Sequence, residues 1–245
     1  MQQTELFSIL DSVESTNNYA MAQVHAGLAN NGQAWFAKEQ WGGKGQRGKT
    51  WLSAKNENII LSIAIKPNKL FISNPFSFSM IVANICRHFF ALKANAEIKI
   101  KWPNDIYAND RKAGGVLIEN SFKGKEWQWA VVGIGININQ TIFEKEISNA
   151  TSLKLMTNKE TNTITLAKQL HKLIIKELSY YQNICLKDVL ETYNNNLYKR
   201  KETVTLKKDS AVFTTKIKAV NEYGILITED VIEREFVVGE VEWVR

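Results

Sequence analysis

Lys101-Trp102-Pro103-Asn104-Asp105 is the stretch that decides the fold of this chain, and Lys112-Ala113-Gly114-Gly115 follows it closely. Apolar segments flank both motifs, so their polar side chains lie where a core would be expected. A conflict of this kind between hydrophobic pattern and polarity is the usual mark of a functional site. The sequence therefore predicts that a carboxylate and an ammonium meet on one face of a hairpin.

The connection between the two motifs has the residues of a tight hairpin. If Asn109-Asp110 form a two-residue turn, Asp105 pairs with Gly114. In the same register Tyr107 pairs with Lys112, which makes Lys112 and Asp105 diagonal neighbours. The glycines remove side chains beside this pair, as happens where a ligand approaches closely. A surface ion pair worth ~0–1 kcal/mol is the plainer alternative.

Length and composition indicate a globular protein. The chain has 245 residues, of which 44% are apolar. This fits one large domain, or a domain of about 190 residues with a small appendage. No window approaches ~18 uninterrupted apolar residues, and the N-terminus lacks the features of a signal peptide. We therefore expect a cytoplasmic protein that does not enter a membrane.

Charge and cysteine usage narrow the function classes. The net charge of +6 indicates an anionic partner, which can be a nucleic acid, a nucleotide or an acidic protein surface. The basic residues are spread along the chain, which weakens the nucleic-acid interpretation. Cys86 and Cys185 fall in helical patterns and are expected to be free buried thiols, and the three histidines are isolated from one another. Neither a disulfide framework nor a zinc site is expected.

Periodicity predicts interspersed helices and strands. Helices are expected at 16–25, from Asn74-Pro75 onward, at 163–181 and at 187–198. Strands are expected at 6–10, 34–38, 58–66, 97–102, 113–119 and 126–138. Because the connection across 104–118 is a hairpin, we expect an α/β (α+β) fold with a mixed sheet rather than a doubly wound parallel sheet.

After Lys199-Arg200-Lys201 the pattern changes to short strands separated by turn residues. These strands are expected at 203–207, 211–219, 224–228, 234–238 and 241–244. Five short strands within about 45 residues are typical of a small barrel of the SH3 kind. The predicted domains are therefore 1–198, which carries the motifs, and 199–245, the barrel.

The segment from Gly42 to Trp51 has the composition of a ligand-binding loop. It is rich in glycine and interleaves Lys44, Arg47 and Lys49. Such a loop can wrap an anion, and the indole of Trp51 can stack on a nucleotide base. It does not have the spacing of a P-loop, and an ordinary surface loop is the alternative.

Gly133, Gly135, Asn137 and Asn139 alternate with isoleucines along one predicted strand. This strand therefore has one apolar face and one bare, amide-tipped face. The second face suits the floor of a cleft, because asparagine amides both donate to and accept from a purine or ribose. A bulged strand at a sheet edge is the alternative.

Ser15-Thr16-Asn17-Asn18 have the residue types of a helix cap, and at a helix N-terminus they can also hold a polar or anionic ligand. Together with the cationic loop, the amide-lined strand and the lysine–aspartate pair, they predict a site for a nucleotide and a carboxylate. Lys112 would neutralise the charge that develops on an α-phosphate when an acyl-adenylate forms.

At these residues the chain resembles the biotin protein ligases, also called biotin–acetyl-CoA-carboxylase ligases. The resemblance runs in order across nearly the whole chain, and the Lys-Trp-Pro-Asn-Asp motif followed by Arg-Lys is its most specific part. The matching segments are Glu14-Ser15-Thr16-Asn17, Gln40, Gly43 to Trp51, Lys101 to Asp105, Arg111 to Glu119 and Gly133 to Asn137. The resemblance implies a mixed-sheet catalytic domain of the class II aminoacyl-tRNA synthetase and biotin ligase kind.

The resemblance also implies a two-step reaction. With Mg²⁺, the biotin carboxylate would attack the α-phosphate of ATP, giving biotinyl-5′-AMP and pyrophosphate. A lysine of a biotin carboxyl carrier protein would then attack the mixed anhydride. Lys112 and Asp105 would be the catalytic residues, with Lys112 bridging biotin and phosphate. Asp105 would orient Lys112 or assist the incoming amine, and no residue is named as a metal ligand.

The same resemblance implies which residues bind each substrate. Those implied for biotin are Ser15, Thr16, Asn17, Gln40, Lys44, Gly45, Gln46, Lys112 and Gly115. Those implied for ATP and the adenylate are Lys44, Arg47, Lys49, Trp51, Lys101, Asn104, Lys112 and Asn137. Trp51 would stack on adenine, and Asn137 would contact the nucleotide.

The chain departs from the family pattern in the glycine loop. It reads Gly43-Lys44-Gly45-Gln46, where the family usually has Gly-Arg-Gly-Arg. Lys44 keeps the charge but loses the bidentate fork of arginine, and Gln46 loses the charge at a position that in the family helps retain the adenylate. We expect Arg47 and Lys49 to compensate.

Residues 1–14 are too few for the winged helix-turn-helix of family members that repress genes. We therefore expect a monofunctional ligase that does not bind nucleic acid. A lipoate–protein ligase of the same fold is the nearest alternative, and a nucleic-acid-binding module that uses the barrel is the other. A monomer and a homodimer both stay open, the latter through exposed strand edges near 111–119 and 131–139.

Overall fold

The computed structural model describes residues 6–144, 149–181 and 184–244. Seven strands form one sheet in the order β1-β2-β3-β7-β6-β5-β4. They are β1 (Phe7–Leu10), β2 (Ala34–Ala37), β3 (Asn58–Ile65), β4 (Ile98–Lys101), β5 (Asp105–Ala108), β6 (Arg111–Lys123) and β7 (Glu126–Asn137). β1 and β2 pair in parallel and the other neighbours pair antiparallel, which confirms the predicted mixed sheet.

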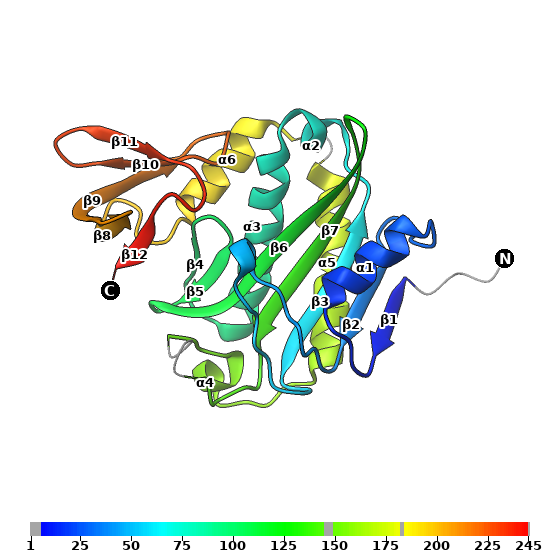
Figure 1. Cartoon of the computed structure of the whole chain (residues 1–245). Helices are drawn as coiled ribbons and strands as arrows, with labels where there is room; N and C mark the ends of the chain where they lie inside the picture. The colour runs from blue at the N-terminus through cyan, green and yellow to red at the C-terminus, as the bar shows by residue number, and fades with distance from the viewer. Residues whose placement is uncertain (1–5, 145–148, 182–183, 245) are drawn as a thin grey trace.

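Alternate residues of the central strands face two different layers. Ile59, Leu61 and Ile63 of β3 point into the main core, with α3 (Pro75–Ala94) and α5 (Thr163–Tyr180). On the opposite face, Ala64 and its neighbours pack against α1 (Thr16–His25). Figure 1 shows α1 in front of the sheet and α3 and α5 behind it. The two-residue period of a strand thus separates a closed core face from a face that one short helix covers.

Capping residues and one proline mark where α1 and α3 begin. The side chain of Ser15 accepts a hydrogen bond from the backbone N–H of Asn18 and caps α1, and Gly27 has a positive φ of 70° just beyond the end of this helix. Asn74 caps α3 in the same way, and Pro75 is the first residue of that helix. Both predicted starts are confirmed.

α3 is long and apolar enough to cross a membrane by length and composition. In the described part of the chain it is the one helix of this kind, and 61% of its most apolar window is buried inside the protein. α3 packs against β4, β5 and β6 of the sheet and also against α5, which itself packs against β2 and β3. These contacts account for its apolar character, because more than one side of the helix contributes to the core.

The C-terminal strands form a second sheet, which is antiparallel and five-stranded, in the order β11-β10-β9-β8-β12. They are β8 (Thr203–Lys208), β9 (Ala211–Val220), β10 (Leu226–Glu229), β11 (Glu233–Phe236) and β12 (Glu242–Val244). The predicted short C-terminal strands are confirmed, and they form a sheet of their own. Its buried residues, such as Leu206 and Ile217, belong to the same core as the large sheet. The exact boundary at 198/199 stays a prediction.

Several expectations differ from the structure. α6 (Leu186–Asn195) ends earlier than expected, and the short helices α2 (Lys69–Ser73) and α4 (Leu153–Thr157) were not predicted. Cys86 is buried as expected, but Cys185 is exposed because it caps α6 rather than lying inside it. Since β7 lies between β3 and β6, residues 131–137 are not a sheet edge. Along β6, residues up to Val116 are flanked on both sides, and the strand extends beyond β5 after that point.

Candidate active site

A cleft of about 510 Å³ opens on the α1 face of the large sheet. The N-terminus of α1, the glycine loop, the β5–β6 hairpin and the C-terminal β-domain surround it. Every residue predicted for catalysis or for binding biotin or ATP lines this cleft. These residues are Ser15, Thr16, Asn17, Gln40, Lys44, Gly45, Gln46, Arg47, Lys49, Trp51, Lys101, Asn104, Asp105, Lys112, Gly115 and Asn137. The fold brings together segments that lie far apart in the sequence, while the role of each residue stays a prediction.

The β5–β6 hairpin has the predicted turn but a different register. Asn109 and Asp110 both have positive φ, 45° and 62°, as a two-residue turn of type I′ requires. The register shifts beyond Tyr107, however, so that Asp105 pairs with Gly115 rather than with Gly114. An extra residue in β6, Ala113, causes this shift by forming a β-bulge.

The bulge brings the two predicted catalytic side chains together. Lys112 Nζ lies 2.7 Å from Asp105 Oδ1, and the side chains are 34% and 27% exposed. A Cβ atom on Gly115 would lie 3.0 Å from Asp105 Oδ1, so glycine leaves the pair accessible from the cleft. Lys112 Nζ also lies 5.6 Å from the centroid of the Trp51 ring. The ammonium is therefore held between a carboxylate and an aromatic face, where a negatively charged ligand can reach it.

The N-terminus of α1 presents buried polar groups at one end of the cleft. Asn17 is engaged within the protein, because Ser62 Oγ donates to its Oδ1 at 2.6 Å and its Nδ2 donates to Glu119 Oε2 at 2.7 Å. The backbone N–H of Thr16 donates to Gln40 Oε1 at 3.3 Å. Sequence patterns did not indicate the contribution of Ser62, which lies buried on β3. Glu119 lay inside a matching segment without an assigned role.

The glycine loop carries Trp51 over β7, two residues along the strand from the position that Asn17 covers. The backbone N–H of Trp51 donates to the carbonyl of Gly43 at 2.9 Å, which closes the loop. A side chain on Gly43 would overlap both the Gln40 amide and the Trp51 carbonyl. A side chain on Gly135 would overlap the indole of Trp51, so the ring lies directly over the bare face of β7.

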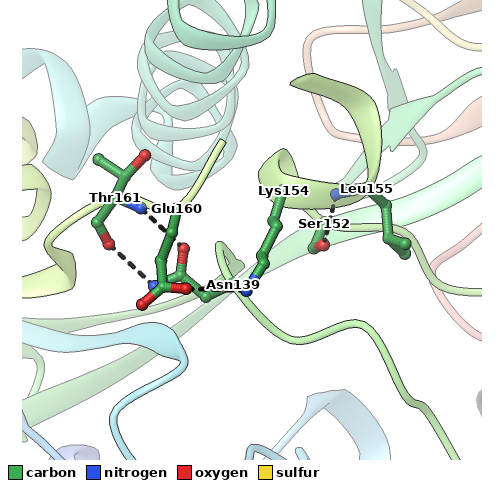
Figure 2. A network of polar contacts seen from close by, with 6 residues as sticks. All are labelled: Asn139, Ser152, Lys154, Leu155, Glu160 and Thr161. Carbon is green, nitrogen blue, oxygen red and sulfur yellow. Dashed lines mark hydrogen bonds and ion pairs between the residues drawn. The ribbon is translucent and has the colours of Figure 1, made fainter. Parts of the chain in front are cut away.

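The amide-tipped face of β7 forms the floor of the cleft only as far as Asn137. Asn137 lines the cleft, and its Nδ2 donates to the carbonyl of Thr151 at 3.0 Å. Asn139 does not line it, because its amide forms two hydrogen bonds with the backbone of Thr161, of 2.8 and 3.0 Å. Figure 2 shows this pair beside the ion pair of Lys154 and Glu160. The alternative of a bulged edge strand is wrong, because β7 is an interior strand.

The C-terminal β-domain supplies a wall of the cleft that the sequence did not predict. The residues concerned are Val238, Gly239, Val241, Glu242 and Trp243. Lys101 Nζ lies 4.8 Å from the centroid of the Trp243 ring. Gly239 has a φ of 89°, and a Cβ atom there would overlap the guanidinium of Arg47. No local signal marked these residues, because only the packing of the two sheets brings them to the cleft.

Comparison with known proteins identifies the family. The family model described as the biotin/lipoate A/B protein ligase family matches residues 9–137, which is more than half of the chain. The chain belongs to this family. The matched range includes the α1 N-terminus, the glycine loop and both strands of the β5–β6 hairpin, which line the cleft.

The chain is also similar to individual proteins. The bifunctional ligase/repressor BirA of Escherichia coli is 30% identical over 145 residues, which are 58% of this chain and 43% of that protein. The biotin–[acetyl-CoA-carboxylase] ligase of Paracoccus denitrificans is 33% identical over 132 residues, 53% of each. The chain thus spans about half the length of these relatives. The biotin protein ligase of Aquifex aeolicus, solved in complex with biotin and ATP, has the same fold, with a TM-score of 0.82 and 24% identity over 98% of both chains.

Proposed function

We propose that this protein is a biotin–protein ligase, which activates biotin as biotinyl-5′-AMP and transfers it to one lysine of a biotin carboxyl carrier protein. The observation that carries the proposal is the Lys112–Asp105 pair at 2.7 Å, which lies beside Trp51 in the cleft that the polar groups of the α1 N-terminus also line. A carboxylic acid bound by those polar groups and ATP bound by Trp51 would meet beside Lys112.

In the first step, a carboxylate oxygen of biotin forms a bond to the α-phosphorus of ATP, and the bond from that phosphorus to the bridging oxygen breaks. Pyrophosphate leaves with the electron pair of that bond. Negative charge gathers on the α-phosphate oxygens in the transition state, and the Lys112 ammonium stabilises it. Asp105 keeps this ammonium in place through the ion pair.

In the second step, the amine of the carrier lysine attacks the carbonyl carbon of the mixed anhydride. A C–N bond forms, the C–O bond to the phosphate breaks, and AMP leaves. The attacking nitrogen loses one proton, which the Asp105 carboxylate is positioned to accept and pass to solvent. Asp105 lines the cleft beside Lys112, so both steps use the same pair.

Mg²⁺ enters this proposal as part of the Mg·ATP substrate. It favours oxygen ligands and in such sites is held mostly by substrate phosphates and one or two carboxylates. In the described part of the chain, no three side chains of His, Cys, Asp or Glu gather into a metal-binding group. Among the described residues, Asp105 and Glu242 are the acidic side chains that line the cleft, and they are the ones that would help to hold the ion of Mg·ATP.

The polar end of the cleft favours biotin over lipoate. Ser15 is buried, and its Oγ accepts from the backbone of Asn18, which leaves its proton for a ligand. The ureido ring of biotin has a carbonyl and two N–H groups, whereas the dithiolane ring of lipoate has no such partners. A site built to form hydrogen bonds rejects a ligand that cannot form them, because its polar groups are left unpaired.

A pyrophosphate-exchange assay tests this function directly. We expect exchange of labelled pyrophosphate into ATP with biotin and not with lipoate. Mass spectrometry of a carrier domain incubated with ATP, biotin and this protein should then show the gain of one biotin on one lysine. Exchange with lipoate alone would favour a lipoate–protein ligase. A carrier domain of unchanged mass would overturn the proposal.

Arg47 is expected to retain the adenylate in place of the charge that Gln46 lacks. In the described part of the chain no hydrogen bond or ion pair engages the Arg47 guanidinium, which lies in the cleft wall against Gly239. Replacing Arg47 by alanine should therefore accelerate release of biotinyl-AMP about tenfold, as expected for a hydrogen bond to a charged group. Stopped-flow or filtration of labelled adenylate measures this rate. The exposed Arg111 provides a control as Arg111→Ala, and equal release rates for both variants would contradict the role of Arg47.

A further inference from the structure

Tyr193 is a fully buried tyrosine outside the cleft that connects α6 to the motif containing Asp105. Its ring is 0% exposed, and its hydroxyl donates a hydrogen bond of 2.7 Å to the carbonyl oxygen of Pro103. Pro103 lies two residues before Asp105, in the turn between β4 and β5. Nothing in the sequence connected α6 with this turn, because the two segments are separated by 90 positions.

The turn is held by three different parts of the protein. Besides the bond from Tyr193, the indole Nε1 of Trp102 donates to the carbonyl of Gly224 in the C-terminal domain at 2.9 Å. The amide of Asn104 donates to the carbonyl of Val116 on β6. Each of the three residues between β4 and Asp105 is therefore held by its own hydrogen bond. The one that holds Pro103 comes from the hydroxyl group of Tyr193.

Tyr193 is a rigid anchor. Its ring packs edge-on against Phe76, with the ring centroids 6.0 Å apart. The next residue, Asn194, makes two hydrogen bonds to the backbone of Val220, of 2.7 and 2.9 Å, which fix α6 to the C-terminal sheet. Burial raises the pKa of Tyr193 far above its ordinary value, and the negative charge of Asp105 raises it further. The hydroxyl therefore stays protonated and keeps donating at any pH at which the enzyme works.

We propose that Tyr193 is a positioning residue for Asp105, which fixes the start of β5 and thereby the contact between Asp105 and Lys112. This inference rests on the proposed ligase function for its kinetic consequences. Asp105 is the first residue of β5, and its backbone position follows directly from that of the preceding turn. Loss of the hydroxyl frees the carbonyl of Pro103, so the Asp105 carboxylate is no longer held at one distance from Lys112.

The variant Tyr193→Phe tests this role, because it removes one oxygen atom and keeps the ring in the core. We expect kcat for transfer of biotin to a carrier lysine to fall about tenfold. The KM for biotin and for ATP should change less than about twofold, because the residues that would bind these two substrates are not touched. Tyr181→Phe, which removes the hydroxyl of a half-buried tyrosine at the end of α5, is the matched control and should keep wild-type kcat.

A double-mutant cycle with Asp105→Asn separates positioning from a general loss of stability. If Tyr193 acts through Asp105, adding Tyr193→Phe to Asp105→Asn lowers kcat no further. If Tyr193 only stabilises the core, the two losses multiply, and that result would overturn the inference. Each kcat is measured at a temperature at which circular dichroism shows all four proteins folded.

The proposed ligase function is tested with the wild-type protein alone. Absence of biotin-dependent exchange in the wild type rejects the ligase function without bearing on Tyr193. In that case a crystal structure of Tyr193→Phe still tests the geometry. The Lys112 Nζ–Asp105 Oδ1 distance, 2.7 Å in the wild type, should lengthen beyond hydrogen-bonding range. An unchanged distance would reject the positioning role.

Discussion

Replacing Lys112 by methionine is expected to lower biotin-dependent pyrophosphate exchange by about 100- to 1,000-fold, the cost of removing one preorganised charge from a transition state. Methionine keeps most of the unbranched apolar stem of the lysine side chain and removes the ammonium, together with its contact with the Trp51 ring. Because the charge on the α-phosphate develops only during the reaction, kcat should fall much more than the affinity for biotin or ATP. Exchange of labelled pyrophosphate at saturating substrates measures this loss.

Lys99 on β4, in the same sheet, offers a matched control. It also forms an ion pair with an acidic residue, Glu97, at 2.8 Å, and its side chain is 33% exposed, almost as much as that of Lys112. Lys99 does not line the cleft. Lys99→Met should therefore leave exchange within about twofold of the wild type, because exposed ion pairs contribute little. Equal losses in the two variants would show that the Lys112 charge has no special place in the reaction.

The hairpin shows how far local sequence predicts this site. The Asn109-Asp110 turn was predictable because few residue pairs adopt two successive positive φ values, and these two do. The bulge at Ala113 was not predictable, because a bulge depends on the fit between two strands and leaves no mark in one of them. The register consequently differed by one residue on β6, and Gly115 rather than Gly114 faces Asp105.

Contacts between residues that lie far apart in the sequence could not be predicted, for a different reason. The pattern predicts Asn137 and Asn139 on one strand face, yet β7 ends at Asn137, and Asn139 bonds Thr161 in a loop whose path the pattern does not specify. Gly239 contacts Arg47, and Tyr193 contacts Pro103, only because the C-terminal sheet and α6 pack where they do. Periodicity predicts which face of an element is buried and does not predict what covers it.

Replacing Gly135 by alanine and replacing Gly133 by alanine are expected to damage two different parts of the cleft. Both glycines lie on β7 and point to the same face, and neither has a positive φ, so the backbone accepts alanine at both positions. The new methyl group at Gly135 would overlap the indole of Trp51, and the one at Gly133 would overlap the amide of Asn17. Two similar changes, two residues apart, therefore displace two different side chains.

Gly135→Ala should weaken ATP binding about 10- to 100-fold, since stacking of a base on an aromatic ring contributes about 1–3 kcal/mol, and it should leave biotin binding within about twofold. Gly133→Ala should have the reverse effect, with biotin binding weakened about tenfold through the displaced Asn17 and ATP binding retained. Titration calorimetry of each ligand with each variant measures both affinities, and each variant serves as the control for the other. A loss of both ligands in both variants would mean that the methyl groups distort β7 as a whole. A loss of neither would mean that Trp51 and Asn17 are not the contacts of the two ligands.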